Sequence, residues 1–243
     1  MAKLVFDIET IGMPLGSFDE TQQEYLLRYA KNDEEREQQI RNLNLTPLTA
    51  RVGCIAMLNM DSNQARVVYL AEEPSETTTD DGVNYIAVTD EAEILKNFWQ
   101  VIGKRKEERG NSDFVYEKFV TFNGRTFDCP FVMLRSALLG IRPARNMLAG
   151  GKYNSRPFHI DLIDELTFYM SSASGPTRKF NFDFYCKAFG IPSSKAEGVT
   201  GNDVNRLFGE KRYKEIAEYC MRDVRSTALL YNKWKSLLSF TND

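Results

Sequence analysis

Apolar residues are spaced in two ways along the chain, and this spacing predicts where strands and helices lie. Short runs rich in β-branched and aromatic residues predict strands at residues 3–9, 52–60, 66–70, 119–122 and 158–162. Longer stretches with apolar positions at helical spacing predict helices at residues 90–104, 130–139, 180–189 and 212–238. This order of elements favours an α/β fold, a mixed sheet flanked by helices, in a single domain of residues 1–243.

Three polar segments interrupt this pattern. Residues 17–42 are helix-prone and densely charged, so they predict an exposed helical insertion. Residues 72–82, EEPSETTTDDG, predict a polar loop, and residues 142–157, rich in Arg, Gly and Asn, predict a second one.

The overall composition is that of an ordinary water-soluble globular protein, with 42% hydrophobic and 27% charged residues. No apolar run approaches the roughly 20 residues that span a bilayer, and the acids within LVFDIET argue against a signal peptide. The four cysteines form no CxxC pair, so neither a zinc site nor a disulfide framework is predicted. A reducing, cytoplasmic location is therefore expected.

Charge is distributed unevenly, although the net charge is only −3. Residues 1–119 carry 13 basic and 22 acidic side chains, whereas residues 120–190 carry 9 and 5, and residues 191–243 carry 9 and 7. A basic C-terminal half can bind phosphates whatever the total charge. Chance clustering of solvated charges explains the same counts, so charge alone identifies no partner.

Two acidic residues share one face of the first predicted strand. Because side chains alternate along a strand, Asp7 and Glu9 point to one side, and Phe6 and Ile8 point to the other. Burying two carboxylates is unfavourable without a compensating charge. Either the strand end is exposed, or a cation binds there.

A third acid interrupts an apolar stripe on the last predicted helix. On a helical wheel, Asp223 lies near the centre of a stripe that contains Ile216 and Leu230. An aspartate on a buried face needs a partner, which is either a core-facing Lys or Arg or a metal ion. Tyr219 lies one turn before it on the same face.

A fourth acid, Asp128, follows the turn-forming pair Asn123-Gly124, between a predicted strand and a predicted helix. Its place two residues before Pro130 is also that of a helix N-cap. This segment alone therefore leaves a structural and a chemical role open.

Together the four carboxylates predict a site for two divalent metal ions, Mg²⁺ or Mn²⁺, since these ions prefer oxygen ligands. Such a pair of ions promotes in-line displacement at phosphorus. The chain has one histidine, His159, which excludes mechanisms that need paired histidines. It also contains neither GxxxxGK[ST] nor GxSxG, which excludes P-loop NTPases and hydrolases with that nucleophile motif.

Three short motifs resemble, in order, those of the DEDD superfamily of 3′→5′ exonucleases, which has a ribonuclease H-like fold. FDIET resembles the first motif. NGRTFD resembles the second, in the Asn-x3-Phe-Asp form of family B DNA polymerase proofreading domains, and YCMRD resembles the third, Tyr-x3-Asp. The histidine branch has a histidine where this chain has Glu218, so the chain resembles the tyrosine branch. The stretch from His159 through FGIPSSKAEGVTG is similar to stand-alone bacterial predicted exonucleases related to those domains.

The resemblance implies a role for each matching residue. Asp7 would bridge both ions. Glu9 and Asp223 would complete the ion that holds the attacking water, and Asp128 would anchor the second ion. Tyr219 would orient the water through its hydroxyl group.

The implied reaction is hydrolysis of terminal phosphodiester bonds from the 3′ end of a single strand, with DNA favoured over RNA and nucleoside 5′-monophosphates as products. Substrate contacts are expected from Asn123, Arg125, Phe127, Arg178 and Lys179. Four further phenylalanines could also stack on bases: Phe131, Phe180, Phe182 and Phe184. Most of these rings are expected in the core. No membrane contact is expected, and no protein partner is indicated.

Two alternatives stay open. A non-catalytic nucleic-acid-binding module of the same fold would usually have lost an acid or the tyrosine, and all five are present here. A 3′→5′ exoribonuclease is equally compatible with the motifs, because no residue that would reject a 2′-hydroxyl can be identified.

Overall fold

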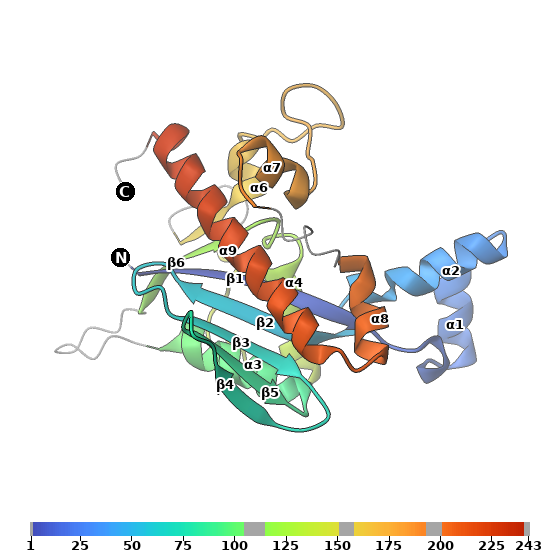
Figure 1. Cartoon of the computed structure of the whole chain (residues 1–243). Helices are drawn as coiled ribbons and strands as arrows, with labels where there is room; N and C mark the ends of the chain where they lie inside the picture. The colour runs from blue at the N-terminus through green and yellow to red at the C-terminus, as the bar shows by residue number, and fades with distance from the viewer. Residues whose placement is uncertain (1, 105–114, 151–157, 193–200, 241–243) are drawn as a thin grey trace.

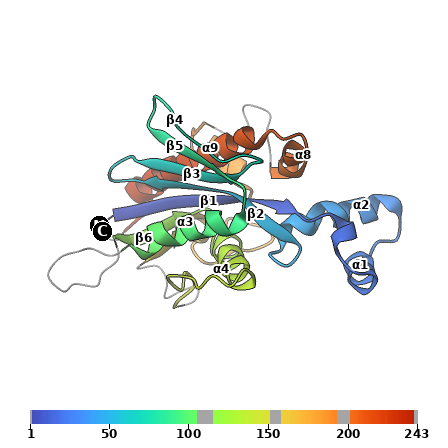
Figure 2. The same ribbon diagram turned by 90° about the horizontal axis from the view of Figure 1, so that it is seen from below.

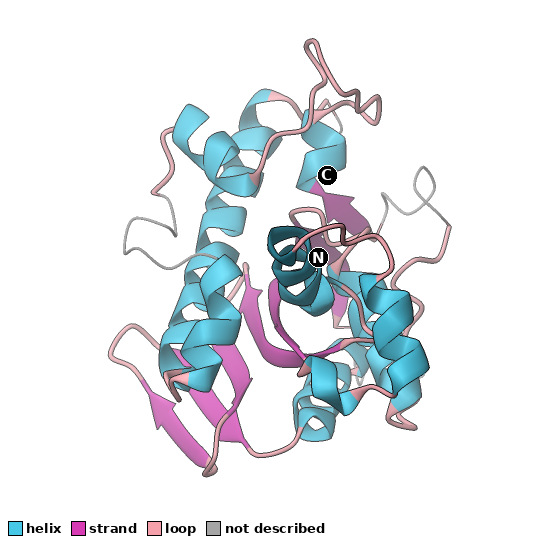
Figure 3. Ribbon diagram, turned by 90° about the vertical axis from the view of Figure 1, so that its right-hand side faces the viewer, coloured by secondary structure: helices cyan, strands magenta, loops and turns pink. Residues whose placement is uncertain are grey.

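A seven-stranded mixed β-sheet forms the centre of the part of the chain that the computed structural model describes, residues 2–104, 115–150, 158–192 and 201–240. The strand order is β4-β5-β3-β2-β1-β6-β7, and helices flank the sheet (Figures 1 and 3). The strands are β1 (Ala2–Gly12), β2 (Ala50–Asn59), β3 (Ala65–Leu70), β4 (Ser75–Thr78), β5 (Val83–Val88), β6 (Tyr116–Thr121) and β7 (His159–Asp161). The predicted fold class, a mixed sheet flanked by helices, is confirmed.

The described helices vary widely in length, and none is long and apolar enough to cross a membrane. The α-helices are α1 (Glu20–Leu27), α2 (Asp33–Arg41), α3 (Glu91–Gly103), α4 (Asp128–Leu138), α6 (Leu162–Leu166), α7 (Phe182–Ala188), α8 (Val204–Gly209) and α9 (Tyr213–Leu237). Short 3₁₀ helices lie at Leu15–Ser17, Asn42–Leu45 and Gly201–Asp203.

Strand β1 lies inside the sheet, between helices on its two faces. Phe6 packs against Phe98 of α3, with ring centroids 5.3 Å apart. On the opposite face of the strand, Asp7 contacts Cys220 of α9. Figure 2 shows α9 and α3 on opposite sides of the sheet. The alternation predicted for residues 3–9 therefore directs apolar side chains towards α3 and carboxylates towards α9.

One edge of β1 loses its neighbouring strand halfway along. Strand β2 pairs with β1 in antiparallel register from Leu4 to Gly12. Strand β6 pairs with it in parallel only as far as Val5. The edge from Asp7 onwards is thus free to accept groups from other elements, and crevices beyond the carboxyl ends of strands are common binding sites.

Residues 17–42 form the two helices α1 and α2, in agreement with the predicted helical insertion, and the pair projects from the sheet (Figure 2). Neither helix has a buried residue. Both begin with strong caps, since Asp19 accepts a hydrogen bond from the Gln22 N–H and Asn32 from the Glu35 N–H. Capping and local charge explain why these helices form with little packing.

The loop prediction for residues 72–82 is wrong in part, because β4 lies within it. All four residues of β4 are exposed, so this edge strand leaves no apolar alternation in the sequence. Strand β5 was also not predicted, although its buried Val83, Tyr85 and Ala87 alternate with less buried positions. Of the predicted loop at 142–157, residues 151–157 lie outside the described part of the chain, as do 193–200 of the FGIPSSKAEGVTG stretch.

A buried ion pair attaches α4 to the rest of the scaffold. The Arg135 Nε donates a hydrogen bond to Glu91 Oε1 of α3 at 2.8 Å. The same carboxylate oxygen accepts the Val52 N–H of β2, also at 2.8 Å. This one contact therefore joins α3, α4 and β2, and α4 begins with Asp128.

Removing the guanidinium should destabilise the fold strongly. Arg135→Met leaves the Glu91 carboxylate buried without its cation, so we expect a loss of about 3–5 kcal/mol in the free energy of unfolding. Urea denaturation measures this loss. Arg41→Met, which breaks the exposed pair with Glu37, is the control and should hardly change stability. Equal effects of the two substitutions would contradict the assigned role.

Candidate active site

Asp7 and Glu9 lie on the half of β1 that β6 no longer covers. A bulge follows Glu9, because Glu9 pairs with Cys54 and Thr10 with Val52, which leaves Gly53 as the extra residue. A Cβ atom on Gly53 would lie 2.3 Å from the Ile11 Cδ1 atom, so a larger residue here would force the Ile11 side chain to move. The bulge ends the regular ladder directly beside the two acids.

Asp128 reaches the same edge of β1 from the first turn of α4. Its Oδ1 accepts a hydrogen bond from the Ile8 N–H at 3.1 Å, and Ile8 lies between Asp7 and Glu9 on the strand. The alternative that Asp128 caps its own helix is not what the structure has, because Phe127 occupies the N-cap and makes no side-chain capping bond. The Asp128 carboxyl group instead bonds to the strand backbone between the two other acids.

Helix α9 contributes the fourth acid and the tyrosine. Tyr219 and Asp223 are both buried, and they lie one turn apart on the same face of the helix. Between them, the Cys220 Sγ lies 3.5 Å from the Asp7 carbonyl oxygen. The ligand atoms of Asp7, Glu9 and Cys220 all lie within 4.8 Å of one another. The five residues that the motifs singled out thus converge on one site.

This cluster raises the pKa of each acid for which a shift is resolved. Burial is the largest cause for Asp7, and the surrounding carboxylates, Asp128 first, raise its pKa further. Burial and then Asp223 do the same for Glu9. Burial raises the pKa of Asp128 to about 7, although its backbone hydrogen bonds oppose the shift. The metal-free site therefore holds protons that carboxyl groups in water would release.

The donor set fits divalent metal ions. Clustered carboxylates repel one another and lose hydration, and a bound cation offsets both penalties. The nearby Cys220 thiol has a pKa raised well above its usual range, mainly by burial, so it stays neutral. The charged ligands are therefore oxygens, which suits Mg²⁺ and Mn²⁺ better than a thiolate-seeking ion.

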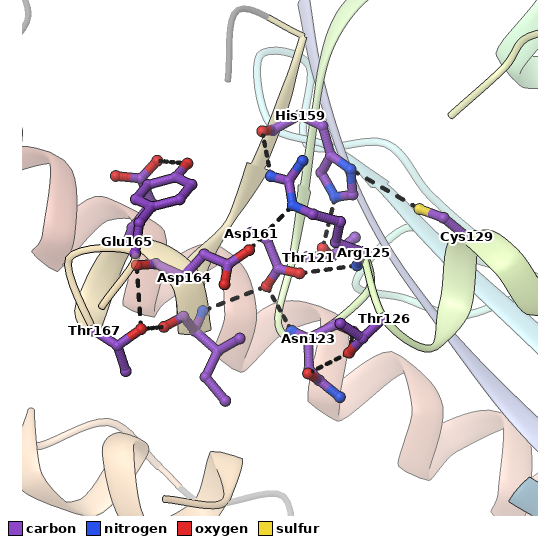
Figure 4. A network of polar contacts seen from close by, with 12 residues as sticks. Thr121, Asn123, Arg125, Thr126, Cys129, His159, Asp161, Asp164, Glu165 and Thr167 are labelled. Atoms are coloured by element: carbon purple, nitrogen blue, oxygen red, sulfur yellow. Dashed lines mark hydrogen bonds and ion pairs between the residues drawn. The ribbon is translucent and has the colours of Figure 1, made fainter. Parts of the chain in front are cut away.

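Hydrogen bonds to Asp161 fix the turn that precedes Asp128. Asn123 adopts a left-handed conformation with a φ of 66°, which asparagine tolerates well. Its N–H and that of Arg125 donate to the two Asp161 carboxylate oxygens at 2.7 and 2.8 Å (Figure 4). A Cβ atom on Gly124 would lie 2.6 Å from the Thr121 side chain, so this position also needs glycine.

Arg125 was predicted to contact phosphate, and the structure instead places its side chain inside the protein. The Nε donates to Asp164 Oδ2 at 3.1 Å and the Nη2 donates to the His159 carbonyl oxygen at 3.2 Å (Figure 4). Both charged side chains are less than one tenth exposed. This position corrects the prediction, because the polar sequence around Arg125 suggested an exposed residue.

His159 has a structural position beneath the Asn123 turn. Its Nε2 lies 2.8 Å from the Thr121 hydroxyl, and the ring is completely buried. Burial, with a further contribution from Arg125, lowers its pKa to about 3, so the ring is neutral at physiological pH. His159 therefore supports the strands under the turn and carries no charge into the site.

The other predicted substrate contacts differ in exposure. Phe127 is half-buried and packs against Phe131, which belongs to the core. Arg178 and Lys179 are exposed on the segment that leads into α7. Of the five predicted contacts, Arg125 alone is thus withdrawn from solvent.

The sequence matches the model of a family described as predicted 3′-5′ exonucleases related to the exonuclease domain of PolB, over residues 45–240. The chain belongs to this family. The match includes the motifs around Asp128 and Asp223 and begins after Asp7 and Glu9. Membership confirms the resemblance to polymerase B proofreading domains and supports a nuclease activity.

The fold is similar to that of the family B DNA polymerase from the hyperthermophilic archaeon Pyrobaculum calidifontis, with a TM-score of 0.58 and 19% identity. The aligned region covers 96% of this chain and 24% of the polymerase chain, so this chain spans about a quarter of the length of the polymerase. The similarity confirms the ribonuclease H-like fold. Among curated proteins, no sequence matches this chain significantly.

The raised pKa of the buried Asp128 predicts that the stability of the metal-free protein depends on pH. A carboxyl group with a higher pKa in the folded than in the unfolded protein loses its stabilising contribution as the pH rises, here from about 4 to about 7 for Asp128. Asp128→Asn mimics the protonated group. In EDTA, we expect this variant to become progressively more stable than the wild type between about pH 4 and pH 7.

Thermal melting of both proteins across this range measures the difference, since 1 kcal/mol corresponds to about 2–4 °C in a domain of this size. The comparison cancels shared contributions such as that of His159, whose lowered pKa makes stability rise with pH below about 6.5. Mg²⁺ or Mn²⁺ should narrow the difference by stabilising the wild type. A difference that does not change with pH would contradict the electrostatic account.

Proposed function

We propose that this protein is a 3′→5′ exonuclease that degrades single-stranded DNA, in preference to RNA, to nucleoside 5′-monophosphates in the cytoplasm. The observation that carries the proposal is the convergence of four carboxylates, of which Asp7 is half-buried and the others are buried, and the Tyr219 hydroxyl on one site. Family membership supports attack from the 3′ end. The similarity to a DNA polymerase supports DNA as the substrate, and the four free thiols suit a reducing compartment.

Two Mg²⁺ or Mn²⁺ ions would be held by the four carboxylates. Asp7 is the central ligand of this proposal, because the charges of all three other acids act on it. Glu9 and Asp223 would complete one ion, and Asp128 would hold the other. When bound, the ions activate water and neutralise charge on the attacking and leaving oxygens at phosphorus.

The Tyr219 hydroxyl is suited to orienting water. Burial and the charges of Glu9 and Asp223 raise its pKa, so the group stays protonated at neutral pH. A protonated hydroxyl group donates one hydrogen bond, and the lone pairs of its oxygen can accept others. A water molecule that donates to this oxygen can direct its own lone pair towards the phosphorus atom.

Substrate contacts in this proposal come from Asn123, Phe127, Arg178 and Lys179. Asn123 and Phe127 flank the turn that delivers Asp128, so they lie next to the proposed reaction centre. Arg178 and Lys179 supply exposed positive charge on the segment before α7. Arg125 keeps its structural role on Asp164.

A single-stranded DNA oligonucleotide labelled at its 5′ end should be shortened to a ladder from the 3′ end in Mg²⁺, and EDTA should stop the reaction. Asp223→Asn should abolish the ladder without unfolding the protein. Asp33→Asn, on the exposed helix α2, is the matched control and should keep full activity. A blunt duplex should react roughly tenfold more slowly for each base pair that must open, at about 1.4 kcal/mol per step.

Other products would change the conclusion in defined ways. Immediate release of the labelled 5′ nucleotide, or cleavage of a circular strand, would falsify the proposed polarity. Faster degradation of an RNA oligonucleotide of the same sequence would identify an exoribonuclease. Metal binding without hydrolysis of either polymer would identify a non-catalytic binding module.

Tyr219→Phe should lower kcat by about 10²–10⁴, the usual scale for a group that positions a proton-transfer step. Affinity for Mn²⁺, measured by calorimetry, should hardly change, because the hydroxyl is not a metal ligand in this proposal. Tyr213→Phe on the same helix, whose ring packs against Phe208, is the control. Loss of metal binding together with activity would assign the hydroxyl to the metal site instead.

A further inference from the structure

An exposed stack of aromatic rings lies on α7 and the segment before it. The rings of Phe180 and Phe184 are 4.4 Å apart and inclined by 17°, which is a parallel stack. The Arg178 guanidinium lies 4.8 Å from the centre of the Phe180 ring. Phe184 is 55% exposed. One face of its ring is covered by Phe180, so the exposed area lies largely on the other face.

Packing of the core does not explain these two rings. The inward side of α7 consists of Cys186, which is buried, and of Phe182 and Tyr185, which pack against Phe122. Phe184 points out from this arrangement. A large apolar ring left more than half in water gains little from burial, and such surfaces commonly mark binding sites.

The stack lies beside the proposed reaction centre. The Phe122 ring is 4.9 Å from that of Phe182, and Phe122 directly precedes the Asn123 turn. On the other side, the Ser226 hydroxyl, one turn after Asp223, donates to the Pro192 carbonyl oxygen at 3.1 Å. Helix α7 is therefore anchored to both motif-bearing elements, and Figure 1 shows it beside α6 above the sheet.

The charge around the stack suits a polyanion. Arg178, Lys179 and Lys187 are exposed, while the one acid nearby in the described part of this segment, Asp183, is paired with Lys187 at 2.9 Å. Exposed aromatic rings that alternate with cations bind single-stranded nucleic acids, because bases stack on the rings and phosphates contact the cations. An occupant of this surface needs negative charge for the cations and flat apolar groups for the exposed ring. A single DNA strand carries both in every nucleotide, through its phosphates and its bases.

We propose that Phe184, stacked on Phe180 and flanked by Arg178, is a platform for an unpaired base of the substrate strand, upstream of the 3′ nucleotide in the reaction centre. This inference rests on the proposed function and deepens it. A base in a duplex is stacked within its own helix and cannot use the ring. The platform would therefore favour single strands and make affinity depend on strand length.

Binding and chemistry can be tested separately. Phe184→Ala should weaken binding of a fluorescein-labelled dT12 strand by about 5- to 100-fold, the usual effect of removing one stacking ring. Fluorescence anisotropy in Ca²⁺ measures this affinity. The p-nitrophenyl ester of thymidine 5′-monophosphate is too short to reach the platform, so its hydrolysis in Mn²⁺ should stay within about twofold of the wild type. Phe184→Trp should restore strand binding.

Tyr29→Ala is the matched control, because Tyr29 is 70% exposed and also lies beside an arginine, Arg28, but is placed between α1 and α2. This variant should bind dT12 like the wild type. Unchanged strand affinity in Phe184→Ala would overturn the platform, and so would an equal loss in Tyr29→Ala or a loss of ester hydrolysis. If the wild type hydrolyses neither substrate, the proposed function fails, whereas the binding comparison still decides the platform.

Discussion

The hydrogen bond from the Ile8 N–H to the Asp128 carboxylate is the contact on which the site depends. It joins the first motif, on β1, to the second, at the start of α4, across 120 residues of sequence. It is possible only because β6 stops pairing with β1 at Val5 and leaves this backbone edge open. A continuous ladder would have used the same N–H for sheet pairing, and Asp128 would lie elsewhere.

The same contact brings like charges together. Four acids share one site in which Asp7 is half-buried and the other three are buried. Burial raises the pKa of Asp7, Glu9 and Asp128, and repulsion within the group raises those of Asp7 and Glu9 further. Such an arrangement is unfavourable by itself and becomes favourable with bound cations. The scaffold must therefore hold the acids in place against their repulsion, which explains why so much of the surrounding structure consists of buried polar contacts.

Two networks provide this support. Arg135 and Glu91 fix α4 to α3 and β2. Asp161 accepts both N–H groups of the turn at Asn123 and Arg125, and the Arg125 guanidinium returns to Asp164. Because these hydrogen bonds tie the turn before Asp128 to β7 and α6, the turn has little freedom. A site built on such a turn can keep its geometry when the substrate arrives.

The sequence by itself determined the elements that carry strong local signals. The alternation at Asp7 and Glu9 and the stripe around Asp223 reflect periods of two and 3.6 residues, which depend only on local backbone geometry. The mixed sheet, the helical insertion and the three motifs follow from such signals. The exposed strand β4 left none, because no side chain of it is buried.

Only the tertiary structure decided which groups meet. Arg125 and Arg178 both lie in polar segments, yet one is buried on Asp164 and the other stays in water beside Phe180. The partners of Ile8 and Asn123 lie 120 and 38 residues away, and no local pattern encodes a contact at that distance. Burial and long-range hydrogen bonds depend on how the strands and helices pack together, and this packing alone separates the residues that support the site from inside the protein from those that stay exposed.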